Sequence, residues 1–309
     1  MLQKTIEKSV YCSGIGLHSG KKVHLGFHPA PVDSGISFAV KTSGGTKFIN
    51  PGPSDIIDTS FATTIAKNGC KVSTVEHLLA AVRGMDLDNL TIEVGGDEIP
   101  IMDGSAASYV FLINQAGICR QNKSKKILAL KSEFFLQEDG KWIKGYPSDN
   151  FRVDYNIDFP HPLVGEQSFS FMLDTQNFVD SLCKARTFGF IKDVEHLQNN
   201  GLIQGGSLEN AVVLDDSGVV NPEGMRFEDE PVRHKVLDFI GDMGLMQLQI
   251  RGHFEVYCSG HALNANYLYN LEKNKDSVLE LIDMEGQGLN KDEVVGKDVQ
   301  GVPAEVLAG

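Results

Sequence analysis

The sequence predicts an α+β protein whose sheets are mainly antiparallel. Several strand-like stretches precede the longer helical stretches in each half of the chain, whereas a βαβ protein would alternate one strand with one helix. The chain has 309 residues, 41% of them hydrophobic, enough for two domains with sizeable cores. Because a polar stretch at 121–126 precedes a fresh series of strands, we expect an N-terminal domain at 1–122 and a C-terminal domain at 127–283.

The first half contains strand patterns separated by turns and two helical patterns. The glycine-rich segment 14–20 resembles a dinucleotide-binding loop, but its third glycine is misplaced and no clear helix follows, so we expect a tight turn. Helices are expected at 73–83, ended by Gly84, and at 105–117. Strands are expected at 3–11, 21–28, 36–40, 47–49 and 89–94.

The second half has more strands and a central amphipathic helix. Strands are expected at 127–136, 141–146, 151–158, 168–173, 211–214, 246–250 and 253–258. Helices are expected at 175–183, 193–200, 231–243 and 263–283. Residues 284–309 are rich in glycine and charge, and we expect a mobile tail there.

The helix at 231–243 carries the first candidate site. Pro231 suits the first helical turn. His234, Asp238 and Asp242 follow one another at intervals of four residues, so they share one face of the helix. An imidazole and a carboxylate at this spacing can point at one metal ion. The same spacing is also typical of the solvated face of an amphipathic helix, and the helix alone does not decide between the two.

Composition narrows the classes of partner and compartment. The net charge of −13 and the pI near 5.1 argue against nucleic acid as the main partner. The five cysteines are scattered without a Cys-x-x-Cys pair, which argues against a disulfide framework and a cysteine-rich zinc site. No apolar run reaches transmembrane length and the N-terminus lacks a signal-peptide core, so we expect a soluble cytoplasmic protein. We also expect a monomer, although no residue pattern in the sequence tests the oligomeric state.

Glu76 and His77 form the second candidate site, and both have simpler interpretations. Ser73-x-x-Glu76 is a capping-box pattern, in which the glutamate only caps a helix. His77, beside Leu78, is equally compatible with a histidine in the core. The tetrapeptide of residues 75–78 also recurs at 194–197, where we interpret the histidine as a surface residue. The residues alone do not choose between the two copies.

His261 forms the third candidate site. It lies in the segment 259–264, on a glycine turn that follows an expected strand, where active-site residues are common and capping or loop residues equally so. Asp242 is placed to hold such a histidine protonated.

Together these residues suffice for a hydrolytic metal site. His77, His234 and Asp238 supply two nitrogens and a carboxylate, and the fourth position left open is typical of catalytic zinc. Such an ion lowers the pKa of bound water toward about 7, and Glu76 can accept its proton. His261, as a cation, can stabilise an oxyanion and protonate a leaving amine. The set predicts hydrolysis of an amide.

Three motifs carry a resemblance to a known family. The segments 74–78, 233–242 and 259–264 resemble the signatures of the zinc-dependent UDP-3-O-acyl-N-acetylglucosamine deacetylases of lipid A synthesis in Gram-negative bacteria. The segments 14–20, 99–105, 185–190 and 226–230 also match, in order, between residue 3 and about residue 270.

The resemblance implies two similar domains, each with a β-sheet layered with helices, and an active site at their interface. It implies a UDP-linked acylated amino sugar as substrate, acetate as product, and zinc, with Fe²⁺ as an alternative ion. It assigns a function to Glu76 and His77 and none to His196. The implied metal ligands are His77, His234 and Asp238, and the implied catalytic residues are Glu76, His261, Asp242 and Thr187.

The resemblance also implies substrate contacts. Lys235 is expected to meet the phosphate, Phe159 to stack on the uracil, and the segment 188–212, with Phe188 and Phe190, to form an apolar passage for the acyl chain. Ordinary core packing is the alternative for that segment. The sequence departs from the family pattern at two places that concern substrate binding. Cys258 stands where many relatives have Lys or Arg, and Phe61–Ala62 stand where relatives vary.

Two rival functions stay open at this level. Two histidines and a carboxylate also form the facial triad of non-haem iron oxygenases. A nucleotide-sugar binding module, in which Glu76 is only a helix cap, needs no catalysis at all.

Overall fold

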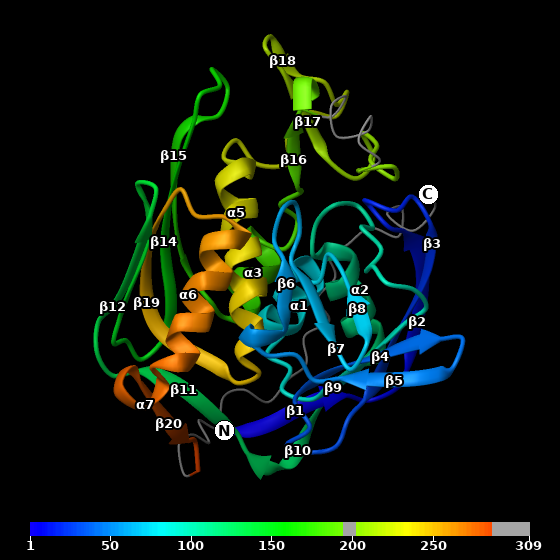
Figure 1. Cartoon of the computed structure of the whole chain (residues 1–309), viewed down its shortest axis with the longest axis vertical. Helices are drawn as coiled ribbons and strands as arrows, with labels where there is room; N and C mark the ends of the chain where they lie inside the picture. Colours follow the sequence, from blue (N-terminus) through cyan, green and yellow to red (C-terminus); the bar gives the residue numbers. More distant parts are fainter. Residues whose placement is uncertain (194–201, 286–309) are drawn as a thin grey trace.

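Two mixed, mainly antiparallel sheets enclose a layer of helices, so the expected α+β class is confirmed (Figure 1). The computed structural model describes residues 1–193 and 202–285. The first sheet has five strands in the order β2-β3-β9-β4-β5, and only its β4–β9 pair is parallel. Its strands are β2 (Val10–Ile15), β3 (Lys22–Pro29), β4 (Ile36–Thr42), β5 (Gly45–Ile49) and β9 (Leu90–Val94).

The second sheet has seven strands built around β19 (Gln249–Tyr257). Strand β19 pairs with β11 and β14 in parallel and with β13 in antiparallel orientation. Alternate residues of β14, such as Val153 and Tyr155, are buried, as expected for a sheet with one face on the core. The other strands are β11 (Lys126–Leu130), β12 (Phe134–Glu138), β13 (Lys141–Tyr146), β14 (Phe151–Phe159), β15 (Gly165–Met172) and β20 (Leu279–Asp283).

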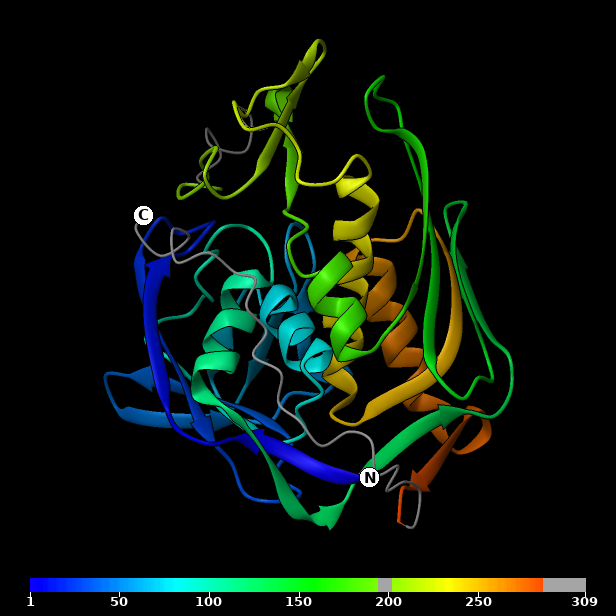
Figure 2. The same cartoon turned by 180° about the vertical axis from the view of Figure 1, so that it is seen from behind.

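The longer helices lie between the two sheets (Figures 1 and 2). Helices α1 (Glu76–Gly84) and α5 (Glu230–Met243) pack against each other, one from each half of the chain. A side chain at Gly241 would place its Cβ 2.0 Å from the carbonyl oxygen of Glu76, so glycine permits this close crossing. The other helices are α2 (Ala107–Ala116), α3 (Thr175–Ser181), α6 (His261–Lys273) and α7 (Lys275–Val278), with short 3₁₀ turns η1 (Pro53–Asp55) and η2 (Gly244–Met246).

Three small sheets complete the fold. Strands β16 to β18 stand apart from the large sheets, at the top of Figure 1. Strand β10 pairs with β1 whereas β11 joins the seven-stranded sheet, so the chain changes sheets at Lys125. The expected domain boundary falls at this point and stays a prediction. The strands are β1 (Leu2–Ile6) with β10 (Ile118–Ser124), β6 (Ile56–Asp58) with β7 (Thr64–Lys67) and β8 (Cys70–Val72), and β16 (Phe188–Phe190) with β17 (Val212–Asp215) and β18 (Gly218–Val219).

Several expected strand boundaries are wrong because pairing decides where a strand ends. The expected strands at 3–11 and 127–136 are each two strands in different pairings. The expected strands at 246–250 and 253–258 are one strand, β19, which runs through Gly252 where the chain packs on Leu130. A local pattern of polarity cannot show which partner strand will be available.

The last expected helix is also wrong in its second part. Helix α6 ends at Lys273, and residues 279–283 form β20, which pairs with β11 along its full length. Met284 is buried and its N–H donates to Lys125, so the expected tail at 284–309 does not begin at 284. Outside the described residues lie residues 194–200 of the expected helix at 193–200, the repeat at 194–197 with His196, and the rest of the tail from 286.

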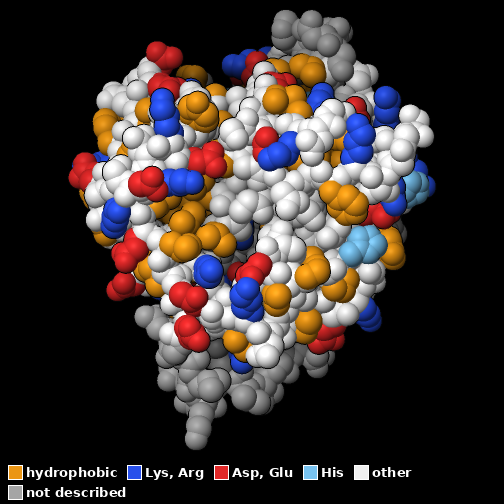
Figure 3. Space-filling view, turned by 60° about the horizontal axis from the view of Figure 1, so that its bottom comes forward, with side chains coloured by type: hydrophobic (Ala, Val, Ile, Leu, Met, Phe, Trp, Pro, Cys, Tyr) orange, Lys and Arg blue, Asp and Glu red, His pale blue; other side chains and the backbone are white. Residues whose placement is uncertain are grey.

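The buried hydrophobic side chains of both halves form one continuous core. The face in Figure 3 presents acidic and basic side chains interspersed, with hydrophobic side chains in small groups. Within 1–193 and 202–285, no helix combines the length and apolar character needed to cross a membrane.

Candidate active site

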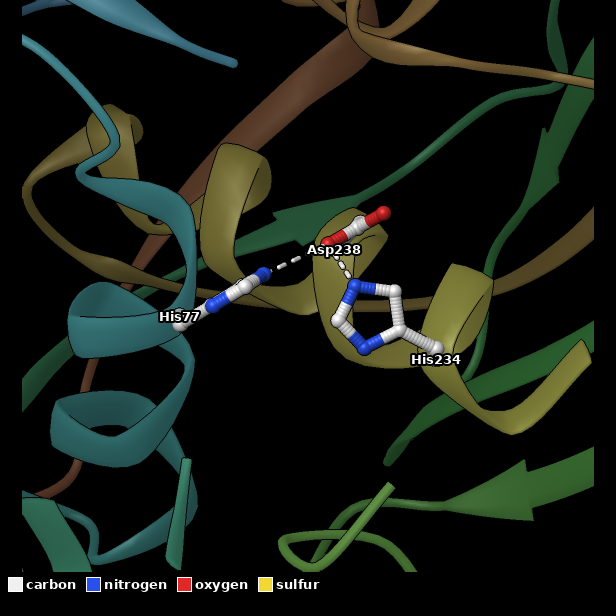
Figure 4. Close-up of side chains that lie close together, drawn as sticks. All are labelled: His77, His234 and Asp238. Carbon is white, nitrogen blue, oxygen red and sulfur yellow. Dashed lines mark ion pairs between the residues drawn. The ribbon is translucent and has the colours of Figure 1, made fainter. Parts of the chain in front are cut away.

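The α1–α5 crossing brings together three residues from distant parts of the chain (Figure 4). His77 lies in the first turn of α1, and His234 and Asp238 lie one turn apart on α5. The Nε2 atoms of His77 and His234 are 3.5 Å and 3.2 Å from Asp238 Oδ1. All three side chains are buried, and their nearest ligand atoms lie within 4.8 Å of one another. The face that His234 and Asp238 share is therefore not a solvated face.

The donor set fits a metal ion. His234 Nδ1 lies 3.1 Å from the carbonyl oxygen of Ala185, which can only accept, so Nδ1 carries the proton and Nε2 keeps its lone pair. Burial lowers the pKa of His77, which favours its neutral form. Asp238 Oδ1 is buried without a hydrogen-bond partner among the described residues. A buried carboxylate oxygen in this state calls for a cation.

Glu76 lies next to this cluster and does not cap its helix. Helix α1 begins at Glu76, and its N-cap residue makes no side-chain capping bond. The Ser73 hydroxyl pairs with Thr64, and the Glu76 carboxylate accepts the N–H of Thr63 at 3.0 Å. The capping-box interpretation is therefore wrong. Burial raises the pKa of Glu76 to about 7, which suits a group that exchanges a proton near neutrality.

His261 is the first residue of α6 and faces the cluster from the other side. Its Nδ1 lies 3.0 Å from Asp242 Oδ2, and its Nε2 lies 3.9 Å from both Glu76 Oε1 and Asp238 Oδ2. Burial alone would lower the pKa of His261, but the carboxylates of Asp242 and Glu76 outweigh it and raise the pKa to about 9. A protonated imidazole therefore faces a carboxylate across the cluster.

Two residues around Asp242 were missed by the sequence analysis. Thr63 donates its hydroxyl to Asp242 Oδ1 at 2.6 Å, and Asn264 donates to Oδ2 at 2.8 Å. Asn264 is three residues beyond His261 on α6, a spacing that places both on one helix face and was available as a signal. Thr63 had no such signal, because 179 residues separate it from Asp242.

A cavity of about 450 Å³ opens onto the cluster. Thr187, Phe188 and Lys235 line it, together with Glu76, His77, His234, Asp238 and His261. Lys235 Nζ bonds Asp238 Oδ2 at 2.8 Å, so this lysine contacts the candidate ligand directly. The turn between β12 and β13 contributes charged residues that the sequence analysis did not single out, namely Glu138, Asp139 and Lys141.

The three expected phenylalanines contact one another but do not share one cavity. Phe159 packs against Phe188 and Phe190 with ring centroids 5.5 Å and 5.9 Å apart. Phe188 lines the 450 Å³ cavity, whereas Phe190 lines a separate one of about 260 Å³ with His161.

The two places where the sequence departs from the family pattern differ in exposure. Cys258 is half-buried, whereas Phe61 is half exposed and lines the 450 Å³ cavity.

Comparison with known proteins places the chain among one group of enzymes. The model of the family described as UDP-3-O-acyl N-acetylglycosamine deacetylase matches residues 3–273. The UDP-3-O-acyl-N-acetylglucosamine deacetylases of Oleidesulfovibrio alaskensis and Nitratidesulfovibrio vulgaris are each 51% identical over 284 residues, 92% of this chain and 93% and 92% of theirs. The enzyme of that name from Lawsonia intracellularis is 46% identical over 287 residues, 93% of each chain.

Proposed function

This chain belongs to the UDP-3-O-acyl N-acetylglycosamine deacetylase family, and from that premise we propose how it works. It hydrolyses the N-acetyl group of UDP-3-O-(3-hydroxyacyl)-N-acetylglucosamine, releasing acetate, in lipid A biosynthesis. The metal ion is zinc, held by His77, His234 and Asp238. Its monomeric state and its location in the cytoplasm stay predictions from the sequence.

One observation carries this proposal. Buried ligand atoms of three residues converge within 4.8 Å, and Asp238 Oδ1, which accepts no hydrogen bond from any described residue, lies among them. Two nitrogens and one carboxylate leave a coordination position open, which is typical of catalytic rather than structural zinc. When bound, the ion polarises the amide carbonyl and lowers the pKa of the attacking water.

Glu76 and His261 divide the proton transfers between them. Glu76, ionised, accepts a proton from the attacking water through Oε1, the oxygen that faces His261. His261, held protonated by Asp242, stabilises the developing oxyanion and donates its Nε2 proton to the leaving amine. Thr187, at the cavity wall, adds a hydrogen bond to the oxyanion.

The remaining expected residues bind the substrate. Lys235, at the cavity wall beside Asp238, is the cation for the substrate phosphate. Phe159 stacks on the uracil. Phe188 and Phe190 offer apolar surface to the acyl chain, although they face different cavities.

The decisive experiment is incubation with the UDP-linked substrate under anaerobic conditions. We expect one acetate per product and a mass loss of one acetyl group, abolished by a chelator and restored by zinc. Consumption of oxygen with a co-substrate would instead support the iron oxygenase. Binding of the substrate without acetate would support a binding module.

The identity of the ion needs its own control. The apoprotein is reloaded with zinc or with Fe²⁺ in separate anaerobic samples, and turnover per bound ion is compared. Turnover with Fe²⁺ only would contradict zinc as the working ion while leaving the deacetylase activity in place.

A further inference from the structure

Thr63 lies in the loop between β6 and β7 and contacts three groups of the candidate active site. Its hydroxyl oxygen lies 2.6 Å from Asp242 Oδ1 and 3.1 Å from His261 Nδ1. Its main-chain N–H donates to Glu76 Oε2 at 3.0 Å. The residue is 1% exposed, so water does not compete for these contacts.

The direction of these hydrogen bonds follows from the chemistry of the partners. An ionised carboxylate only accepts, so the single hydroxyl proton of Thr63 points to Asp242. The lone pairs of Thr63 Oγ1 are then free to accept from the Nδ1–H of His261. Nδ1 is thereby held by two acceptors, Asp242 Oδ2 and Thr63 Oγ1, and Nε2 is left facing Glu76 and Asp238.

The contacts of Thr63 also cross the interface between the two halves of the chain. Thr63 and Glu76 belong to the N-terminal half, whereas Asp242 and His261 come from α5 and α6. Thr63 therefore holds Glu76, the proposed base, through its backbone N–H. Its side chain holds Asp242, which in turn orients His261, the proposed acid. This arrangement fixes the separation of the two groups.

We propose that Thr63 is a positioning residue for hydrolysis, and that its hydroxyl orients the Asp242–His261 pair relative to Glu76. The proposal rests on the proposed function, because it presumes that Glu76 and His261 act as base and acid. Thr63 touches neither His77, His234 nor Asp238 in any hydrogen bond found among the described residues. Its hydroxyl should therefore matter for turnover and not for metal binding.

The next residue offers a matched control. Thr64 is also buried, and its hydroxyl bonds the Ser73 hydroxyl at 2.8 Å and makes no hydrogen bond with Asp242 or His261 among the described residues. A Thr→Val change at either position removes one buried hydroxyl and keeps the shape and the backbone N–H. Both variants thus lose one buried hydrogen bond and any stability that it contributes. Only Thr63→Val also loses the contact with the Asp242–His261 pair.

The experiment measures kcat, KM and bound zinc for Thr63→Val, Thr63→Ser and Thr64→Val. For Thr63→Val we expect kcat to fall about 10- to 100-fold, the range typical of residues that support a reacting group, with KM and zinc content unchanged. Thr63→Ser keeps the hydroxyl and should restore most of kcat. Thr64→Val should keep the wild-type kcat even if the loss of its hydrogen bond lowers the stability of the protein.

Three outcomes would overturn the role of Thr63: a wild-type kcat in Thr63→Val, a loss of kcat that Thr63→Ser does not restore, or a fall that zinc loss accounts for. If Thr63→Val does not fold, Thr63→Ala is judged by the same criteria. A second measurement combines Thr63→Val with Asp242→Asn. If Thr63 acts through Asp242, the two losses of kcat should not multiply, so strictly multiplicative losses of kcat would also contradict the proposal. A wild-type chain that releases no acetate would instead overturn the proposed function.

Discussion

Two groups of buried polar residues meet at the α1–α5 crossing, and they differ in how well their atoms are paired. The ligand cluster consists of His77, His234 and Asp238, and Asp238 Oδ1 has no hydrogen-bond partner among the described residues. The acid–base cluster consists of Glu76, Thr63, Asp242 and His261. In that cluster both oxygens of Asp242 are hydrogen-bonded, to Thr63 on one side and to Asn264 and His261 on the other.

This difference separates a site that needs a ligand from a site that is already organised. A buried polar atom without a hydrogen bond costs about 1–3 kcal/mol, and more when it is charged, so the ligand cluster is complete only with a cation. The acid–base cluster is held by groups of the protein itself and needs no ion to keep its geometry. Changes in the first cluster should therefore alter metal binding, and changes in the second should alter turnover alone.

The largest effect is expected from Asp238→Ala. The variant loses the only carboxylate of the ligand cluster, so we expect substoichiometric zinc by elemental analysis and acetate release at background. Added zinc should stabilise the wild type against unfolding, by about 2.7 kcal/mol at a free concentration 100 times its Kd. It should leave the variant unchanged. Stoichiometric zinc in Asp238→Ala would remove Asp238 from the ligand set.

Glu76→Ala and His261→Ala should break turnover while the metal stays. A general acid or base contributes typically about 10²- to 10⁴-fold, and we expect kcat to fall within that range in each variant. Zinc content should match the wild type, because neither residue belongs to the ligand cluster. Near-normal turnover in either variant would contradict the division of roles.

Gly241→Ala should disturb both clusters at once. The new Cβ would lie 2.0 Å from the carbonyl oxygen of Glu76, so α1 and α5 must move apart and carry His77 away from His234. Overpacking of this kind costs about 1–3 kcal/mol of stability, and we also expect weaker zinc binding and a lower kcat. Unfolding curves and zinc titration measure the change. Gly218→Ala, whose Cβ would meet no atom within 4 Å, is the control and should alter neither quantity.

The smallest effect should come from an ionic contact at the far end of α1. Asp86 bonds Lys4 and Lys125 and accepts from Gln249 on β19. Burial alone would raise the pKa of Asp86, but the two lysines outweigh it and lower the pKa to about 2. A lowered pKa contributes stability above the unfolded value near 4, and this contribution is lost as the pH falls toward 2.

Unfolding of the wild type and of Asp86→Asn as a function of pH tests this contact. The wild type should be the more stable of the two at pH 5 to 7, and the difference should shrink between about pH 4 and pH 2. The kcat at neutral pH should be unchanged, since Asp86 lies at the opposite end of α1 from Glu76. A difference that grows on acidification would contradict the assigned pKa shift.

Local patterns predicted the elements whose own sequence carries a strong periodic signal. The helix expected at 231–243 is α5 (Glu230–Met243), and its hydrophobic residues, such as Val236 and Ile240, are buried. Errors occurred where long-range pairing determines the element. Residues 279–283 have no strong local signal for a strand, and they form one because β11 offers its free edge.

The candidate site shows the same division. The spacing of His234, Asp238 and Asp242 placed them on one face, and the family motifs added His77, Glu76 and His261. The capping-box pattern at Ser73 favoured a structural role for Glu76, and tertiary packing overrode it because Thr63 and Thr64 bind the groups that would have formed the box. Thr63 could not be predicted, because a loop hydroxyl that contacts residues of two distant helices produces no periodic pattern in the sequence.

By itself, the sequence determined the residue types of the site, the helical face that carries three of them, and the family to which the chain belongs. Only the tertiary structure decided that His77 lies opposite His234, that one oxygen of Asp238 accepts no hydrogen bond from the described residues, and that Thr63 joins the base to the acid. Helical periodicity acts over a few residues, whereas these contacts depend on how closely α1 approaches α5. That distance is set by packing at Gly241.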